Sequence, residues 1–485
     1  MHTDEAVNAY ITGSLLAGES FHYDSQDRHG PALFAVAEPL VKLLGAKNFS
    51  GLTETQLRLT PVLAGSATVL LFGAGVELFG FSACLVAALL FTCAPLPVYY
   101  SRYFIHETLF VAATLGLILS GGRALKKQSA SSAALAGLCA ALMLACKETA
   151  VIHFFAVGFA LLGNWLWSAR TRPRFGIGTH VSRSESGDTS PHSKFLKLTL
   201  MALGVFIFTA VLLFTWFGQN WSVFTDLLHA VPRFAARAGG EGHEKPFGYY
   251  FHLLDPMMIL SILAVAGIYA ALCDAVSGAR QTGLWLAIYG LVVLVIYSTI
   301  PYKTPWLALN LWLPLALLCG LGVAAFWEQF KNPAGRWGMG IAGVFLLALL
   351  GLQTKLWAFD QPADEKNPFA YAHTGEDLLR LPARLEELMR QEKLSNPRIA
   401  MVAADAWPLP WYLRKFSQVG FWQPDQETGD ADFFITPTAV SDRLAARLKN
   451  FQPEYFGVRP NVLLILWVPV TNNSPTGASP PHGTP

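Results

Sequence analysis

Four short groups of charged residues could carry chemistry, and each stands beside an apolar or helical stretch. The first is the acidic pair Asp4-Glu5, which precedes a helical-looking stretch from Ala6 to Ala17. Adjacent carboxylates can hold a divalent cation or take a proton from an acceptor hydroxyl. The same pair would also stabilise a helix start without any catalytic role, because carboxylates interact favourably with the helix dipole.

The second group is the segment from Ser101 to Glu107, a tight turn between two apolar runs. Glu107 could be a second carboxylate of a site, with His106 beside it as a metal ligand or a proton carrier. Anchoring at the membrane interface by Arg102 and its aromatic neighbours is the alternative interpretation.

The third and fourth groups add cations. Lys147-Glu148 separates two apolar runs, where an ionised side chain is costly unless it is paired or reaches water. In the segment from Pro301 to Trp306 the prolines interrupt a helix, and Tyr302 and Lys303 could meet an anionic head group. A mutual ion pair of Lys147 with Glu148 and simple snorkelling of Lys303 are the alternatives.

Acids together with cations suit the transfer of a group that leaves as a phosphate. The acids would activate the acceptor, and Lys or Arg would stabilise the charge that develops on the phosphate. On this interpretation Asp4, Glu5 and Glu107 are catalytic candidates, and the phosphate ligands are Arg102, Lys147, Tyr302 and Lys303. The sequence has no Gly-rich phosphate loop, so a nucleotide donor or an ATP-driven pump finds no support.

The elements that must position these residues are membrane helices. Of the 485 residues, 53% are hydrophobic and only 14% are charged, so the chain cannot cover itself with polar surface. The net charge of +2 gives no reason to expect a nucleic-acid partner.

About 17 to 25 apolar residues span a bilayer. Ten stretches approach this length: Leu59 to Leu78, Cys84 to Tyr100, Phe104 to Leu119, Ser131 to Cys146, Val151 to Trp167, Leu196 to Phe217, Met257 to Cys273, Leu284 to Ile300, Trp306 to Phe326 and Ile341 to Trp357.

Two basic loops predict the orientation, because Lys and Arg collect on the cytoplasmic side. One follows the third run, and the other, from Ser168 to Lys197, separates the fifth and sixth. The turns at Arg102 to Glu107 and Pro301 to Pro305 then face outward, as do both ends of the chain. The outward stretch from Gly218 to His252 is expected to supply a lid or an acceptor groove.

Four regions are predicted. Residues 1–57 form a first extracytoplasmic loop with amphipathic helices, and residues 58–357 form the transmembrane domain. Residues 358–470 form a small extracytoplasmic α/β domain, with a helix at Leu378 to Arg390, strands at Arg398 to Ala403 and Asn461 to Val468, and a helix at Val440 to Leu448. Residues 471–485 are expected to be a disordered tail.

At these motifs the chain resembles the GT-C superfamily of glycosyltransferases that use polyprenyl-phosphate sugars, which includes the protein O-mannosyltransferases. It looks most similar to the flippase-activity-associated proteins of glycosylation gene clusters. In that superfamily a transmembrane helix precedes the acidic pair, whereas three residues precede Asp4 here. The motifs that carry the resemblance are Thr3-Asp4-Glu5-Ala6, His29-Gly30-Pro31, Leu57-Arg58-Leu59, Ser101 to Leu109, Lys147-Glu148-Thr149, Lys303-Thr304-Pro305-Trp306, Asn367-Pro368 and Trp407 to Arg414.

The resemblance implies a GT-C-like helical bundle and the transfer of a sugar from a polyprenyl-phosphate donor. The acceptor would be a glycan, lipid or protein on the outer face of the plasma membrane, in cell-envelope assembly or protein glycosylation. It implies Asp4 as the base, Glu107 as the second acid and Lys303 as the late lysine. A divalent metal ion at His106 and Glu107 stays open.

Two other functions stay open. An accessory or flippase subunit for lipid-linked sugars would be expected to show an internal repeat and charges at mid-membrane depth, and the sequence has neither. A membrane scaffold that presents the C-terminal module is the third alternative. Transfer assays with a polyprenyl-phosphate sugar would distinguish such a scaffold from a glycosyltransferase.

The orientation predicts that tags placed after Lys194 and after Pro485 lie on opposite sides of the membrane, because five crossings separate them. Protease access to each tag in sealed vesicles measures this. Equal access to both tags would contradict the topology and the shared outer face.

Overall fold

The computed structural model describes residues 1–24, 29–171, 191–240, 242–255, 258–278, 281–444 and 448–470. The chain divides into two compact units. The first contains Met1–Tyr10, Phe49–Gly51 and the chain from Ala372 onward, and the second contains Ile11–Asn48 and Leu52–Tyr371. Helix α1 (Thr3–Leu16) begins in the first unit and ends in the second.

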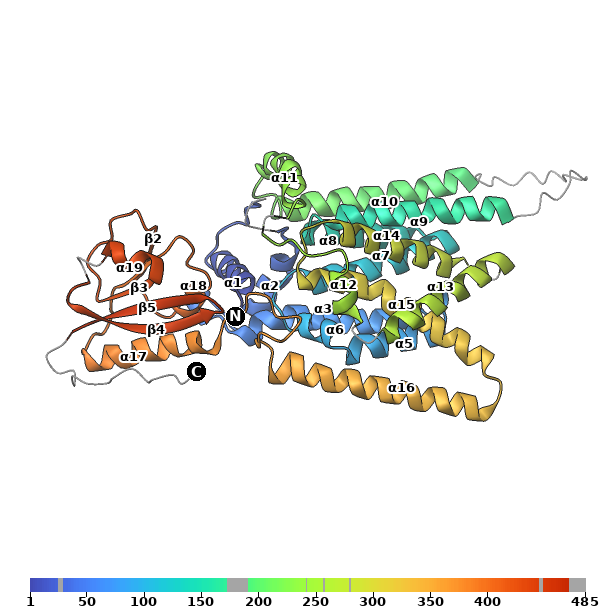
Figure 1. The fold of residues 1–485 in the computed structure, drawn as a ribbon. Coiled ribbons are helices and arrows are strands. Elements are labelled where there is room, and N and C mark those ends of the chain that lie inside the picture. Colours follow the sequence, from blue (N-terminus) through green and yellow to red (C-terminus); the bar gives the residue numbers. More distant parts are fainter. Residues whose placement is uncertain are drawn as a thin grey trace, which may run out of the picture. The chain divides into compact units, whose positions relative to one another are not determined.

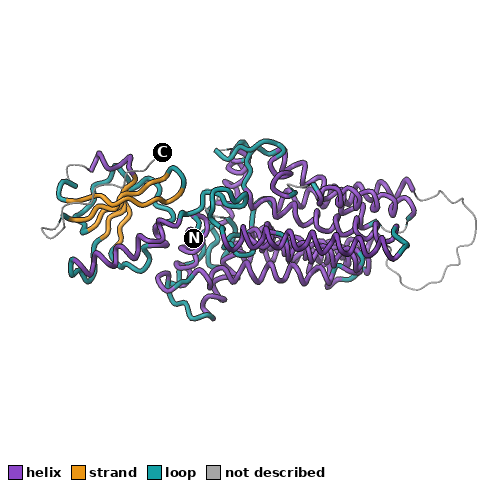
Figure 2. Tube along the Cα trace, turned by 60° about the horizontal axis from the view of Figure 1, so that its bottom comes forward, coloured by secondary structure: helices purple, strands orange, loops and turns teal. Residues whose placement is uncertain are grey.

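Each of the ten predicted apolar runs contains helix in the second unit, and Figure 2 shows these helices running alongside one another. Met257, the first residue of the seventh run, lies outside the described residues. Eight helices in the described part of the chain are long and apolar enough to cross a membrane, and α5 and α8 are shorter apolar helices. The prediction of a helical multi-pass membrane protein is therefore confirmed. The runs form α3 (Glu54–Ala74), α5 (Phe81–Cys93) followed by α6 (Pro95–Tyr100), α7 (Glu107–Lys127), α8 (Ala130–Cys146), α9 (Ala150–Thr171), α10 (Pro191–Phe214), α13 (Ile259–Ser277), α14 (Thr282–Thr299), α15 (Ala308–Gln329) and α16 (Pro333–Thr354).

Prolines divide the second of these runs. Ala94 takes an extended conformation before Pro95, as residues before proline prefer, so α5 ends and α6 begins there. The break turns the chain toward the segment that carries Arg102 and Glu107. Shorter elements complete the unit: α2 (Ala32–Leu43), α4 (Val76–Phe79), α11 (Val223–Arg237), α12 (Tyr249–Leu254), η2 (Pro305–Leu307) and η3 (Lys355–Asp360), a π-helical continuation of α16.

Helix α15 lies at the centre of the unit, and glycines let α13 approach it closely. A Cβ atom on Gly267 would lie 1.9 Å from the backbone oxygen of Leu318, and one on Gly322 would lie 2.1 Å from that of Leu263. Small residues are the usual way in which membrane helices bring their backbones together, because lipid gives little hydrophobic drive for association.

The first unit is built on a five-stranded sheet in the order β2-β1-β3-β5-β4 (Figure 1). Strand β1 (Ile399–Val402) runs parallel to β2 (Val419–Trp422) and β3 (Phe433–Pro437), and β5 (Val462–Pro469) runs antiparallel to β3 and β4 (Phe451–Arg459). The small C-terminal α/β module is therefore confirmed, although the sequence predicted only β1 and β5. Its helices are α17 (Leu381–Gln391), preceded by the 3₁₀ turn η4 (Glu376–Arg380), α18 (Leu409–Tyr412) and α19 (Thr438–Leu444).

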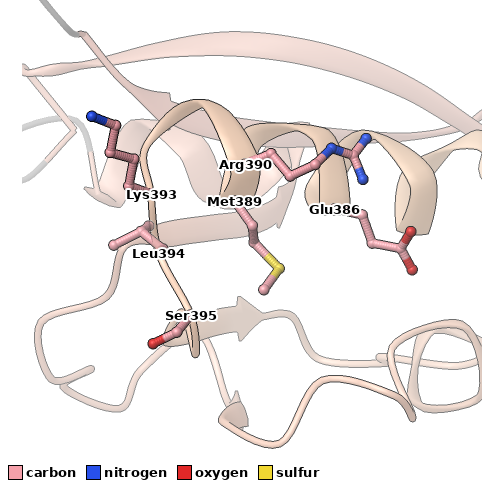
Figure 3. A pocket seen from close by; sticks show the side chains of 6 residues that line it. All are labelled: Glu386, Met389, Arg390, Lys393, Leu394 and Ser395. Carbon is pink, nitrogen blue, oxygen red and sulfur yellow. The ribbon is translucent and has the colours of Figure 1, made fainter.

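Helix α17 matches the amphipathic helix predicted at Leu378 to Arg390. It borders an open pocket of about 430 Å³ that contains none of the predicted site residues. Residues 445–447 of the second predicted helix and the predicted tail at 471–485 lie outside the described residues. The side chains that line the pocket are Glu386, Met389, Arg390, Lys393, Leu394 and Ser395 (Figure 3).

The close contact of α13 and α15 predicts that Gly267→Val destabilises the protein by about 1–3 kcal/mol or more, because the new side chain would overlap a backbone carbonyl. Thermal unfolding in detergent measures the change. Gly343→Val in α16 is the control, since a Cβ at that position meets nothing within 4 Å. Equal melting temperatures for the two variants would contradict the packing.

Candidate active site

The candidate site of the second unit is organised by an ion pair between Glu107 and Lys147. Both residues are buried, with exposed fractions of 2% and 8%. Glu107 is the first residue of α7, and Lys147 directly follows the last residue of α8. These helix ends favour an acid and a base respectively, because of the helix dipole. The pair therefore joins two membrane helices at their ends.

The charge of Glu107 keeps Lys147 protonated. Burial alone would lower the pKa of the Lys147 ammonium, but the attraction and hydrogen bond of Glu107 more than offset this, and the pKa lies above its usual value. Burial of each charge has a desolvation cost that the other charge offsets, so removal of either partner would leave an uncompensated buried charge.

The motif His29-Gly30-Pro31 packs against the end of the same helix. A Cβ atom on Gly30 would lie 2.2 Å from the backbone oxygen of Ala145, so only glycine fits here. The carbonyl of Gly30 accepts a hydrogen bond from Nε2 of His106 at 3.1 Å. His106 is neutral, because its burial, together with the nearby charges of His29 and Lys147, holds its pKa well below the usual value.

Glu148 receives two further side chains. The Tyr23 hydroxyl donates to its Oε1 at 2.9 Å, and Nδ1 of His29 lies 3.1 Å from its Oε2. Burial would raise the pKa of Glu148, but the charge and hydrogen bond of His29 and the hydrogen bond of Tyr23 lower it overall, so the carboxylate is ionised. The predicted site omitted Tyr23, His29 and Glu148, although two of them stand in the quoted motifs.

The predicted metal ligands are engaged with other groups. His106 bonds to the Gly30 carbonyl, and Glu107 is paired with Lys147. Within the described ranges, no group of three or more His, Cys, Asp or Glu side chains could hold a metal ion. The described residues therefore do not fit a metal site.

Arg102, a predicted phosphate ligand, contacts the end of α16. Its guanidinium donates to the Ala358 carbonyl and lies 4.0 Å from the centre of the Phe359 ring. A cation over an aromatic ring is an attractive arrangement. These contacts hold η3 against the turn that precedes α7.

The segment from Pro301 to Thr304 pairs with residues 243–245. Tyr302 and Glu244 form an antiparallel bridge, and the Lys303 amide donates to the His243 carbonyl at 3.1 Å. The rings of Tyr302 and His243 lie 4.8 Å apart, between centroids. Part of the predicted lid, Gly218 to His252, therefore holds the predicted phosphate ligands in place.

Lys303 is a buried cation without an acidic partner. Lys303 is 1% exposed, and its Nζ donates to the carbonyls of Ile300 at 2.5 Å and Lys245 at 3.2 Å. No carboxylate in the described part of the chain lies within ion-pair distance of it. Burial lowers the pKa of Lys303. The adjacent Thr304 hydroxyl is also buried and has no hydrogen-bond partner among the described residues.

Tyr302 connects the two parts of the site. Its phenol lies near enough to Lys147 to contribute to the raised pKa of that lysine. The second unit therefore brings Glu107, Lys147, His106, Tyr302 and Lys303 into one region.

Asp4 and Glu5 occupy the first turn of α1 in the first unit. Glu5 is fully buried and accepts a hydrogen bond from the His2 amide at 3.1 Å. Asp4 is half-buried, and its carboxylate makes no hydrogen bond or ion pair with any residue that the structure describes. Of the two acids, Asp4 is the one whose oxygens are available.

The start of α1 is fixed by the motif at Trp407 to Arg414 and its neighbours. The Met1 carbonyl accepts hydrogen bonds from Thr374 at 2.7 Å and from the Tyr412 hydroxyl at 3.2 Å. The ring of Tyr10 meets that of Trp407 edge to face at 5.9 Å, between centroids. These contacts hold the first turn, and with it Asp4, on the C-terminal module.

Lys147→Met is expected to destabilise the protein by about 3–5 kcal/mol, because it leaves the Glu107 charge buried and unpaired. Adding Glu107→Gln should restore much of the loss, since it removes that charge. Thermal unfolding measures both variants, with Lys355→Met as control because the Lys355–Asp360 pair is exposed. A double variant no more stable than Lys147→Met would show that the unpaired charge of Glu107 is not the cause of the lost stability.

Comparisons with known proteins agree with this architecture. Residues 29–178 match the family described as dolichyl-phosphate-mannose-protein mannosyltransferase. The matched stretch begins at His29 and includes Glu107 and Lys147. No curated protein sequence matches the chain.

Solved structures match almost the whole chain. ArnT from Cupriavidus metallidurans bound to undecaprenyl phosphate matches with a TM-score of 0.61 at 13% identity, covering 96% of this chain and 93% of that chain. The oligosaccharyltransferase of Archaeoglobus fulgidus in complex with Zn and sulfate matches with a TM-score of 0.51 at 12% identity, over 97% of this chain and 71% of that chain. AglB from the same organism, in complex with an inhibitory peptide and a dolichol-phosphate, also has a TM-score of 0.51, at 10% identity, over 98% and 71% of the two chains. The resemblance to the GT-C superfamily is therefore confirmed, and the chain has the GT-C fold.

Proposed function

We propose that this protein transfers a sugar from a polyprenyl-phosphate donor to an acceptor on the outer face of the plasma membrane. The fold supports a membrane glycosyltransferase, because ArnT and AglB were solved with undecaprenyl phosphate and dolichol-phosphate respectively. The donor is then a lipid-linked sugar, and the acceptor is a glycan, a lipid or a protein. The C-terminal module lies on the same outer side.

The buried Lys303 carries this proposal. Among the described residues the Lys303 ammonium meets only carbonyl oxygens, so no carboxylate offsets its positive charge. In a site shielded from water, this charge attracts an anion more strongly than it would in water. The Thr304 hydroxyl beside it is a second donor without a partner among the described residues. The phosphate of the donor supplies the negative charge that Lys303 lacks as a partner and the hydrogen-bond acceptor that the Thr304 hydroxyl lacks.

The other predicted phosphate ligands have different roles in the proposal. Lys147 is neutralised by Glu107, and Arg102 is held by Ala358 and Phe359. Both residues therefore fix the helix ends around the donor, while Lys303 binds the phosphate. Tyr302 orders the Lys303 segment through its bridge to Glu244.

The proposed reaction is an inverting displacement. The acceptor oxygen attacks the anomeric carbon of the sugar, and the proton of the acceptor hydroxyl passes to the base, a role that the resemblance gives to Asp4. The bond between that carbon and the phosphate oxygen breaks, and the lipid phosphate leaves with the electron pair. Lys303 stabilises the charge on the departing phosphate, which is the electrostatic contribution that such reactions need most. Glu5 keeps the first turn of α1 in place.

The assignment of Asp4 predicts that Asp4→Asn loses transfer activity by roughly 100-fold to 10,000-fold, because the amide keeps the size of the side chain but cannot act as the base. Transfer by the purified protein from polyprenyl-phosphate sugars, with the melting temperature recorded alongside, measures this. Asp425→Asn, at an exposed position of the same unit, is the matched control. Full activity of Asp4→Asn would end the base assignment.

The same assay tests the donor site. Lys303→Met should raise the KM for the donor more than the KM for the acceptor, because it removes the charge that binds the phosphate.

Glu107→Gln should reduce activity about as severely as Asp4→Asn, with a loss of stability that Asp4→Asn does not share. An inactive wild type with every donor tested would contradict catalysis and favour an accessory or flippase role.

A further inference from the structure

Helix α11 has two different apolar sides. Val223 and Ala230 are buried, with exposed fractions of 0% and 4%, so one side packs on the protein. Trp221, just before the helix, and Phe224 and Leu228 within it are 62%, 43% and 75% exposed. Their spacing of three and four residues places them on one face of a helix. A large apolar face in contact with water would be unfavourable.

The charged residues of α11 lie on a third side. Asp226, His229, Arg233 and Arg237 follow one another at intervals of three and four residues and so share a face. By the helical angle of about 100° per residue, this polar face points away from the face of Phe224 and Leu228. An apolar face opposite a charged face is the pattern of helices that lie in the plane of a membrane surface.

The exposed apolar face of α11 lies close in the chain to a membrane-spanning helix. The segment that contains α11 connects the candidate spans α10 and α13, and Figure 1 draws α11 near the end of α10. Along α10, Phe208 is 67% exposed, and Phe217, just after it, is 53% exposed. Trp221 follows four residues later, in the turn between the two helices, and Trp is enriched at the depth of lipid head groups. Exposed apolar residues therefore stand on α10, in the turn that follows it and on α11.

The start of this segment also holds residues of the candidate site. The Asn220 side-chain amide lies 3.3 Å from the Phe21 carbonyl and 3.0 Å from Nδ1 of His22. The buried Phe21 ring packs against that of Trp216, with centroids 5.8 Å apart. Two residues later, Tyr23 donates its hydroxyl to Glu148.

We propose that α11 lies in the membrane surface with Trp221, Phe224 and Leu228 in lipid, and that this contact holds the Phe21–Tyr23 segment on Glu148. The partner is the bilayer itself, in the zone between head groups and acyl chains. On the polar face, His229 is exposed to water. The proposal does not depend on the identity of the sugar or on catalysis by this chain.

Spin labels test the membrane contact. Leu228→Cys and Phe224→Cys, with His229→Cys as the matched control, are labelled in a Cys273→Ser background, because Cys273 is the exposed cysteine of the chain. Collision rates with oxygen and with a water-soluble nickel complex are measured in phosphatidylcholine vesicles. The ratio of oxygen to nickel collisions should be several-fold higher at positions 224 and 228 than at 229.

Two results would overturn the membrane contact. Frequent nickel collisions at 224 and 228 would mean that the face is in water. Few collisions of either kind would mean that it packs against protein.

Hydrogen exchange tests the coupling to the site. In lipid nanodiscs, Leu228→Glu should speed amide exchange several-fold in residues 20–24, because it draws the segment away from the bilayer. His229→Glu adds the same charge on the polar face and should leave that exchange unchanged. Unchanged exchange in Leu228→Glu, or equal acceleration in both variants, would overturn the coupling.

Discussion

The buried ion pair of Glu107 and Lys147 is the constraint on which the rest of the candidate site depends. Two charges removed from water cost several kcal/mol each, so neither is tolerated at the end of an apolar helix without the other. The pair therefore fixes the start of α7 against the end of α8. Glu148 follows Lys147 directly and is placed where Tyr23 and His29 reach its carboxylate. Gly30 completes the arrangement, because only a residue without a side chain fits against Ala145.

The three basic residues of the site differ in what they contact. Two of them hold the structure together, and the third is available to bind a ligand. Lys147 faces a carboxylate, and Arg102 faces a carbonyl and an aromatic ring. Among the described residues, Lys303 meets carbonyl oxygens alone, and an antiparallel bridge rather than a charge holds the segment that presents it. An anion that enters the site would gain most of its electrostatic stabilisation from this lysine. The proposed sugar transfer depends on this difference between three basic residues that look alike in the sequence.

The sequence predicted the apolar helices because their composition alone specifies them. The pairing of Glu107 with Lys147 was not predicted, since the two residues are 40 positions apart and the sequence suggested Glu148 as the partner. Strands β2, β3 and β4 were also missed. The shortest of them, β2, has four residues, and such short runs give little periodic signal. Helix α11 was expected only as a lid or groove, because its three faces become visible only once burial separates Val223 from Leu228.

The central claim is that Lys303 binds the phosphate of a lipid donor, and binding of the lipid without its sugar tests it most directly. Wild type and Lys303→Met are titrated with undecaprenyl phosphate and with undecaprenol in detergent, and the melting temperature is followed. Undecaprenyl phosphate should stabilise the wild type, undecaprenol should not, and Lys303→Met should lose the difference. Equal stabilisation by the two lipids, or a full response of Lys303→Met to the phosphate, would contradict the account.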